Sequence, residues 1–438
     1  MREHEKIPYD SFAQQAYWGE GMRLPGQSKG LDRWFFQWQW RNTMRAEDEI
    51  DSDEPVITES GYYASYVIGA QWFDEEKTMP LVVTTKYGCD RIDFLKMFSV
   101  CFNSGIEAKE FSKIYAVDME QPRIKAPELK SVLSPLIVAH FLSIVKEIVK
   151  RGLKKDYVQR EDNLKKVKGR IAIFRNERTN IQKKRYDKVF CQYQEYSEDT
   201  VENRLIKKAL LFSQQILQIA GLSPSLLPLQ HTVHECLSAF ANVNDQIEVW
   251  EVKAIKHHKI FKEYDVAIKL AQMILHRYDY NITNITTAEE EECPVFWIDM
   301  AMLYEHYVLG LLREAYGNLI HYQVRGHTGY PDFVCYSPQV VLDTKYIPRF
   351  NQGSIDTYIV RQLSGYSRDK WIFPTQLDVH IPCVIIYPIE GKEENPFKDK
   401  PLEDFLKKDD RHLWNFHRIA VPLPMLNENQ YGKASENS

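Results

Sequence analysis

The sequence has few features of an exported or membrane protein. It contains no run of about 18 apolar residues, the length that spans a bilayer, and its N-terminal MREHEKIPYDSF lacks the apolar segment of a signal peptide. Its seven cysteines are odd in number, scattered and without a C-x-x-C pair, which favours reduced structural thiols. We therefore expect a cytoplasmic protein with no membrane span.

The sequence also lacks an overall positive charge and a complete nucleotide-binding loop. Its formal net charge of −5 excludes a uniformly basic nucleic-acid binder, so any DNA contact must come from a local patch. Residues 21–28, GMRLPGQS, resemble a Walker A loop but have neither its lysine nor a preceding strand. We expect no nucleotide to bind this chain through a P-loop.

What is present is typical of a soluble multi-domain protein. The chain has 438 residues, of which 44% are hydrophobic and 27% charged, and this length predicts more than one domain. The fold class that we predict is α/β, as a multi-domain α+β chain. The segments are a leader over residues 1–55, a β-rich unit over 56–125, a helical middle over 126–280 and a C-terminal α/β domain over 281–438.

Patterns in the first three segments support this division. Strand-like pieces occur between residues 62 and 118, and helical periodicity is strongest over 133–152, 201–220, 229–242 and 259–278. Residues 146–188 contain 16 Lys or Arg against 6 Asp or Glu, a local excess of 16 − 6 = +10. This basic stretch suits a DNA backbone, but it suits an acidic partner or a solvated face equally well.

A β-hairpin is predicted near the C-terminus, over residues 330–346, YPDFVCYSPQVVLDTKY. Two apolar runs flank a Ser-Pro break, and the loop between them would pair Cys335 with Val340. This register sets Asp332 opposite Asp343. Because side chains alternate along a strand, Lys345 would project from the same face as these two carboxylates.

Two carboxylates and an ammonium on one face are suited to metal-assisted chemistry. Like charges opposed across strands are destabilising, and Mg²⁺, or Mn²⁺ in its place, would compensate through oxygen ligands. A metal-bound water can attack a phosphodiester, while Lys345 orients that water or stabilises the charged phosphate. The alternative is an ordinary hairpin with salt-bridged polar residues. The pattern Pro331-Asp332, then Asp343-Thr344-Lys345, resembles the PD-(D/E)xK nuclease superfamily.

The flanking segments follow the order of that superfamily. Asp299 can cap a helix that runs to about Tyr316, and Glu305 lies within its apolar stripe. A second helix, beginning at Ser354 or Asp356, carries Gln362, and residues 379–387 form a further apolar strand. The superfamily resemblance implies that Glu305 is an additional metal ligand or an acid/base residue, and that Gln362 is a supporting polar residue.

A wider set of motifs precedes the hairpin. It consists of Arg151-Gly152-Leu153, Tyr157, Leu164, Gly169-Arg170-Ile171, Cys191, Glu195, Asp199 and Asn203-Arg204-Leu205-Ile206-Lys207, followed by the aspartate-led helix from Asp299. This set resembles the McrC family, the nuclease subunits of McrBC modification-dependent restriction systems, which act in phage defence. Together with the hairpin the motifs span about residues 150–387, whereas the N-terminal third matches poorly.

The resemblance implies a Mg²⁺-dependent endonuclease that cuts double-stranded DNA, in particular DNA containing 5-methylcytosine. It implies an McrB-like AAA+ partner that binds and hydrolyses GTP, which this chain would stimulate, and the β-rich N-terminal unit would be the docking region. The expected site comprises Asp332, Asp343 and Glu305 at the metal, with Lys345 and Gln362 beside it. The alternatives are a stand-alone repair or resolvase-like nuclease and a non-catalytic activator of an AAA+ motor.

Overall fold

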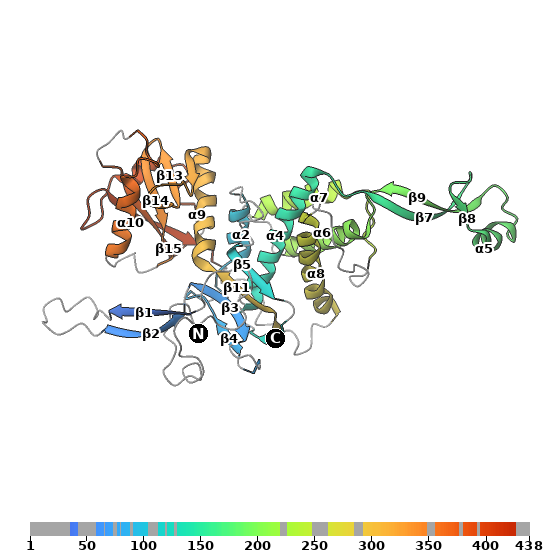
Figure 1. Ribbon diagram of the computed structural model, residues 1–438, viewed down its shortest axis with the longest axis horizontal. Coiled ribbons are helices and arrows are strands. Elements are labelled where there is room, and N and C mark those ends of the chain that lie inside the picture. The colour runs from blue at the N-terminus through green and yellow to red at the C-terminus, as the bar shows by residue number, and fades with distance from the viewer. Residues whose placement is uncertain are drawn as a thin grey trace. The chain divides into compact units, whose positions relative to one another are not determined.

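The protein is described here by a computed structural model, in which two compact units are distinct. One unit combines Met1–Leu136 with Thr286–Ser438, and the other is Ile137–Ile285. Both contain helices and strands, so the predicted mixed α/β class is confirmed (Figure 1). The structure describes residues 36–42 and 58–425 except 65, 73–76, 79, 88–90, 104–112, 119–120, 127–128, 220–225, 248–261, 284–291, 348–354, 376–379 and 392–394.

Some of the expectations drawn from the sequence concern residues outside those ranges, and others concern the cysteines and a membrane span. The Walker-like residues 21–28 and most of the predicted leader lie outside the described residues. Six cysteines in the described ranges are free and buried, as expected of structural thiols. Among the residues that the structure places, no helix has both the length and the apolar character needed to cross a bilayer.

The first unit contains a four-stranded sheet built from three strands of the N-terminal part and one strand that follows much later in the chain. Its order is β4-β3-β11-β5, and β11 pairs antiparallel with both of its neighbours. The continuous apolar run of β11 explains its central place, since all five of its residues are buried. A Cβ at Gly69 would lie 2.1 Å from the Phe296 carbonyl oxygen, so only glycine permits this close strand contact. The bounds are β3 Val67–Trp72, β4 Pro80–Val83, β5 Tyr115–Asp118 and β11 Val295–Asp299.

This sheet crosses the predicted division at residue 280. The expected β-rich unit over 56–125 supplies β3, β4 and β5, while the fourth strand comes from the expected C-terminal domain. The remaining elements of this part are short pairs and helix α2, which packs against α9. Their bounds are β1 Phe36–Asn42, β2 Thr58–Ala64, α2 Phe94–Asn103, β6 Ile124–Lys125 and β10 Glu292–Cys293.

The second sheet of this unit has five strands in the order β12-β13-β14-β15-β16. Strands β12, β13 and β14 are antiparallel, and β14, β15 and β16 are parallel. Helices α9 and α10 both contact β14, and Figure 1 shows the sheet between them. The bounds are α9 Met300–Tyr316, β12 Ile320–Tyr322, β13 Phe333–Tyr336, β14 Gln339–Thr344, α10 Thr357–Ser367, β15 Cys383–Glu390 and β16 Phe416–Leu423.

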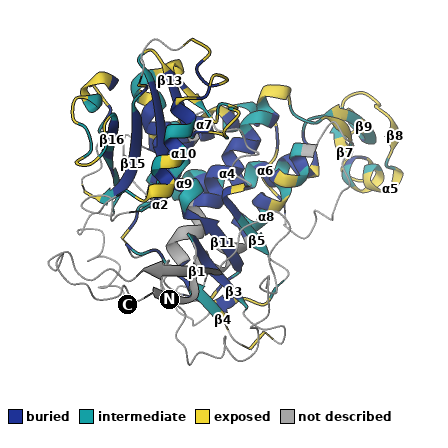
Figure 2. Ribbon diagram, turned by 60° about the vertical axis from the view of Figure 1, so that its left-hand side comes forward, coloured by how far each residue is buried: buried dark blue, intermediate teal, exposed yellow. Residues whose placement is uncertain are grey.

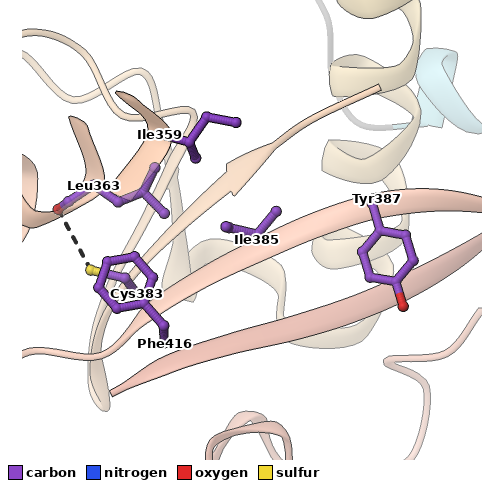
Figure 3. Packing of buried hydrophobic residues seen from close by; sticks show 6 residues of the cluster. All are labelled: Ile359, Leu363, Cys383, Ile385, Tyr387 and Phe416. Atoms are coloured by element: carbon purple, nitrogen blue, oxygen red, sulfur yellow. Dashed lines mark hydrogen bonds between the residues drawn. The ribbon is translucent and has the colours of Figure 1, made fainter. Parts of the chain in front are cut away.

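Apolar packing fixes α10 on this sheet. Ile359 and Leu363 lie one turn apart on the helix and meet side chains of β15 and β16 (Figure 3). The Cys383 thiol reaches the Leu363 carbonyl oxygen at 3.5 Å. The helix therefore lies over one face of the sheet. The predicted order of helix, hairpin, helix and strand is confirmed, and the second helix begins after Asp356.

The second unit combines helices with an extended ribbon. Helix α6 packs against α7 and α8. The bounds of these three helices lie close to the predicted ranges 201–220, 229–242 and 259–278. Strands β7, β8 and β9 form a separate sheet with β9 in the centre, and Figure 1 shows it projecting from these helices. The bounds are α4 Lys130–Arg151, β7 Asp156–Leu164, β8 Arg170–Ile171, α5 Ile173–Asn176, β9 Val189–Ser197, α6 Val201–Ile219, α7 Leu227–Ala239 and α8 Lys262–Thr283.

The ribbon adds a three-stranded sheet to the helices that the sequence predicts for the middle segment. Residues 146–151 of the basic stretch end α4, and the rest of it, 152–188, comprises β7, β8, α5 and the segments that connect them. Figure 2 shows these elements largely exposed or intermediate, whereas the helices of the same unit have buried faces. A strand without a buried face has no apolar alternation, which is why its sequence did not predict it. Gly169 (φ +71°) stands where any Cβ would lie 2.4 Å from the Gln192 carbonyl oxygen.

Residues of the family-like motifs form a polar network at the base of this ribbon. Arg204 donates two hydrogen bonds to the Asp199 carboxylate at 2.8 and 2.7 Å, Asn244 donates its backbone N–H at 2.8 Å, and Arg160 lies at 3.0 Å. Burial raises the pKa of Asp199, but these contacts outweigh burial and hold that pKa below its ordinary value. The motif therefore joins the ribbon to helix α6.

Asn203 completes the network, and its loss is expected to destabilise the second unit. Its amide donates to the carbonyl oxygens of Lys154 at 2.9 Å and Glu198 at 2.7 Å, and it accepts from the Tyr264 hydroxyl at 2.8 Å. Asn203→Ala leaves these buried groups unpaired, so the free energy of unfolding should fall by about 2–4 kcal/mol. Urea unfolding followed by circular dichroism measures the change; Gln215→Ala, exposed on the same helix, is the control and should change little.

Candidate metal centre

The hairpin places the two predicted aspartates opposite each other. Cys335 pairs with Val340, as the sequence predicts, and Phe333 pairs with Leu342. The next pair in this antiparallel register is Asp332 with Asp343. The predicted register is confirmed.

Hydrogen bonds and one ion pair fix the acidic side chains. The Lys345 ammonium forms an ion pair with Oδ2 of Asp343, which is only 1% exposed. Oδ2 of Asp332 accepts from the backbone N–H of Thr344 at 2.7 Å and from the Thr344 hydroxyl at 2.5 Å. The backbone N–H of Asp332 hydrogen-bonds the Asp343 carboxylate. The two strands thus hold both carboxylates and the ammonium in one cluster.

This cluster lies on the face of the sheet that α10 covers. Val341 packs against Tyr366 of α10, and side chains two positions apart on a strand share a face. Asp343 and Lys345 therefore follow Val341 on that face. Strand β14 ends at Thr344, between Asp343 and Lys345.

Burial raises the pKa of both aspartates at this site. Burial, then the charges of Asp343 and Glu305, raise the pKa of Asp332 well above its ordinary range, against the opposing effect of Lys345. Burial also raises the pKa of Asp343. Burial alone would lower the pKa of Lys345, but the two aspartates raise it, so Lys345 remains charged. The single ammonium of Lys345 does not offset the effects of burial and of the neighbouring carboxylates on Asp332.

Glu305 borders the cluster through a neighbouring glutamine. It acts electrostatically on Asp332, and its Oε1 accepts from Nε2 of Gln323 at 3.0 Å. The backbone N–H of Gln323 donates to the Asp332 carbonyl oxygen at 2.9 Å. Gln323 adopts φ +45°, an uncommon conformation for a residue other than glycine. Gln323 thus links α9 to the hairpin, a role that no sequence pattern predicted.

Gln362 reaches the cluster through Tyr366. Its Nε2 donates to the Tyr366 hydroxyl at 2.9 Å. Burial raises the pKa of Tyr366, and the charges of Asp343 and Lys345 also act on it, which places the phenol beside the acidic pair. Tyr366 and Thr344 were not predicted as site residues. Their signal is spacing, since Tyr366 follows Gln362 by one helical turn and Thr344 lies between Asp343 and Lys345.

The donor set fits a hard cation held by few protein ligands. Within the described ranges, no group of three or more His, Cys, Asp or Glu side chains is placed to hold a metal ion. Mg²⁺ commonly takes one or two carboxylates and completes its shell with waters and substrate phosphates. Asp332 and Asp343 supply such a pair, and Oδ1 of Asp332 is not the oxygen that accepts from Thr344. The two aspartates therefore fit a Mg²⁺ ion whose remaining ligands would be waters and substrate phosphates.

These features define the class of protein, a mixed α/β chain with two aspartates and a lysine clustered on a hairpin. The sequence profile described as "McrBC 5-methylcytosine restriction system component" matches residues 94–366. Because the match covers more than half of the chain, this protein belongs to the McrBC family. The recognition made from the sequence motifs is confirmed.

Other comparisons gave distant matches or none. The chain is similar to one in the half-complex of Thermococcus gammatolerans McrB AAA+ hexamers with bound McrC, with 16% identity, a TM-score of 0.34 and 90% of each chain covered. It is also similar to a chain of the Thermococcus gammatolerans McrBC complex, with 14% identity, a TM-score of 0.28, and 61% of this chain and 74% of the other covered. No curated protein matches.

Proposed function

We propose that this chain is the DNA-cleaving subunit of its restriction system, a Mg²⁺-dependent endonuclease built on a PD-(D/E)xK core. The observation that carries the proposal is the cluster of Asp332, Asp343 and Lys345 on one face of the hairpin. Two carboxylates whose pKa values are raised in the absence of a cation have the character of a metal site. Family membership makes DNA the substrate class that the proposal names.

Each side chain has a role that follows from its position. Asp332 and Asp343 would hold the ion, which when bound supplies a Lewis acid and lowers the pKa of water. Lys345 stays protonated beside Asp343 and can stabilise charge that develops on the phosphate. Glu305 would be an additional ligand or an acid/base residue, with Gln323 orienting it. Gln362 would fix the Tyr366 phenol at the edge of the site.

The partner in this proposal is an McrB-like AAA+ GTPase. The half-complex that contains a chain similar to this one consists of McrB AAA+ hexamers with bound McrC. We propose that the partner binds the GTP, that this chain stimulates its hydrolysis through the N-terminal β-rich unit, and that the pair acts on double-stranded DNA containing 5-methylcytosine. The cytoplasm is the proposed location.

A reconstitution assay tests the proposal. The purified chain is incubated with methylated and unmethylated duplex DNA, with and without the AAA+ partner and GTP, across a titration of Mg²⁺ and of Mn²⁺. We expect cleavage that requires the metal and the partner. Cleavage by the chain alone would favour the stand-alone nuclease, and stimulated GTP hydrolysis without any cleavage would favour the non-catalytic activator.

A further inference from the structure

One rim of the proposed metal centre is a rigid loop that ends at the site. Residues 323–332 connect β12 to β13, and the hydrogen bond from the Gln323 backbone N–H to the Asp332 carbonyl oxygen closes the loop at its base. Within the loop, the backbone N–H of Gly326 donates to the Gly329 carbonyl oxygen at 2.8 Å. The segment therefore has a fixed shape and leads directly into a proposed metal ligand.

A buried aspartate after α10 fixes the tip of this loop. Oδ2 of Asp369 accepts from the backbone N–H of Thr328 at 2.7 Å and from its hydroxyl at 2.8 Å, while Oδ1 accepts from the backbone N–H of Trp371 at 2.9 Å. Burial raises the pKa of Asp369, but these hydrogen bonds outweigh it and lower the pKa. The Asp369 carboxylate thus joins this loop to the segment after α10, and both of its oxygens are occupied by these hydrogen bonds.

The anchored segments present two aromatic rings to solvent. Trp371 is 60% exposed although its backbone is fixed, and its ring meets the exposed ring of His327 edge to face at 5.6 Å. We call this pair the aromatic platform. An exposed tryptophan on a rigid backbone loses little conformational entropy when a ligand covers it. Such a residue is a better contact than one on a mobile loop.

The exposed charges around the aromatic platform are positive. Within residues 323–330 and 364–375, the exposed charged side chains are Arg325, Arg368 and Lys370, and the acidic residue, Asp369, is buried. The chain as a whole carries −5, so this local sign is opposite to the protein's net charge. Cations beside an exposed aromatic ring match the phosphates and the sugars or bases of a nucleic acid.

The platform is linked to the metal centre by contacts as well as by sequence. Gly329 is so close to the Tyr366 ring that an added Cβ would lie 3.0 Å from it, and Tyr366 is in turn beside Asp343 and Lys345. Tyr330, which is 56% exposed, directly precedes Pro331-Asp332. A duplex whose scissile phosphate lay at the carboxylates would therefore extend along this loop.

We infer that the aromatic platform of His327 and Trp371, with Arg325 and Lys370, is a DNA-contacting subsite that holds the duplex beside the scissile phosphate. The inference rests on the proposed function for the identity of the ligand. Trp371 supplies apolar contact to sugar or base, and the two cations neutralise phosphates. These residues position the substrate and take no part in bond cleavage.

Binding of labelled duplex DNA tests this subsite. Fluorescence anisotropy is measured with the full chain, alone and with its partner, in Ca²⁺ so that DNA stays intact. Trp371→Ala should raise Kd about tenfold, the effect of losing one stacking contact, and Trp371→Phe should restore most of the affinity. Arg325→Ala and Lys370→Ala should each reduce the slope of log Kd against log salt by about one.

Trp414 provides a matched control. It is also an exposed tryptophan, at 88%, but it precedes β16 at the opposite edge of the sheet from β12, near Asp409 and Asp410. Trp414→Ala should leave DNA affinity unchanged. Equal losses in the Trp371 and Trp414 variants, or unchanged affinity in Trp371→Ala both alone and with the partner, would overturn the inference.

The outcome is separable from that of the proposed function. Wild-type affinity in Trp371→Ala together with Mg²⁺-dependent cleavage by the wild type would refute the subsite and leave the nuclease standing. Trp371-dependent binding without any metal-dependent cleavage would refute the nuclease and retain the DNA contact. Loss of partner binding with unchanged DNA affinity would assign Trp371 to a protein interface instead and refute the inference.

Discussion

Lys345→Ala and Asp343→Ala are each expected to abolish DNA cleavage while assembly with the AAA+ partner is preserved. Removing Lys345 deletes the charge that stabilises the phosphate, an effect of about 10²–10⁴-fold on rate. Removing Asp343 deletes half of the carboxylate pair that holds the metal. Initial cleavage rates of the reconstituted system measure the loss, and size-exclusion chromatography measures assembly.

The exposed pair Asp404 and Lys407 provides the matched control. It has the same chemistry, a carboxylate ion-paired with an ammonium, but both side chains are largely in water. Asp404→Ala and Lys407→Ala should retain wild-type cleavage rates. Full activity in both Asp343→Ala and Lys345→Ala would remove the basis of the site assignment. Undiminished GTPase stimulation in Lys345→Ala, with a wild type that does not cut in any metal, would leave only the activator role.

Asp332→Asn is expected to make the metal-free protein more stable at neutral pH and inactive as a nuclease. Burial and the charges of Asp343 and Glu305 raise the pKa of Asp332 well above the ordinary 3.8, so the folded state binds this proton more tightly than the unfolded chain. The free energy of unfolding of the metal-free protein therefore falls as the pH rises from 3.8, the ordinary aspartate pKa, through the raised pKa of the folded state. Asparagine is neutral throughout, and its oxygen can still accept from Thr344.

The gain should be roughly 0.5–2 kcal/mol at neutral pH, which is typical of relieving a strained functional site. It should shrink as the pH falls toward 3.8, where the wild-type carboxyl is protonated in both states. Lys345 adds no slope in this window, because its raised pKa lies above the ordinary 10.5. Thermal unfolding in EDTA across this pH range measures the difference between the two proteins.

Mg²⁺ should reverse the order of stability. At a concentration of 100 times its Kd, a ligand that binds only the folded state adds about 2.7 kcal/mol, and this gain requires both carboxylates. Mg²⁺ should raise the Tm of the wild type and have little effect on Asp332→Asn. A variant that is less stable than the wild type in EDTA, or equally stabilised by Mg²⁺, would show that Asp332 is an ordinary structural aspartate.

The candidate site was predictable because its geometry is local. The Ser-Pro break and the flanking apolar runs define one register, and that register alone sets Asp332 against Asp343 and places Lys345 beside it. The cap of α9 is local as well, since the Asp299 carboxylate accepts from the Met302 backbone N–H three residues later. Period-2 and capping patterns act over a few residues, so they can be read without tertiary contacts.

The features that were missed depend on residues distant in sequence or on surfaces without a core. Strand β11 pairs with β3, more than two hundred residues earlier, and its apolar run predicts burial but not its partner. The β7–β9 ribbon was missed because few of its side chains are buried, so its sequence shows no clear apolar alternation. Gln323 and Asp369 belong to no recognisable sequence motif. Only the fold brings Gln323 to Glu305 and Asp369 to Thr328.

The sequence by itself determined the hairpin, the acidic pair with its lysine, and the family, because each depends on residue types at short and fixed spacing. The tertiary structure alone decided that β11 joins the N-terminal strands, that the basic stretch continues into the ribbon, and that Asp369 fixes the segment of Trp371 against the loop 323–332. The physical reason is that backbone pairing and burial are satisfied by whichever distant segment completes them, and short-range patterns do not encode that choice.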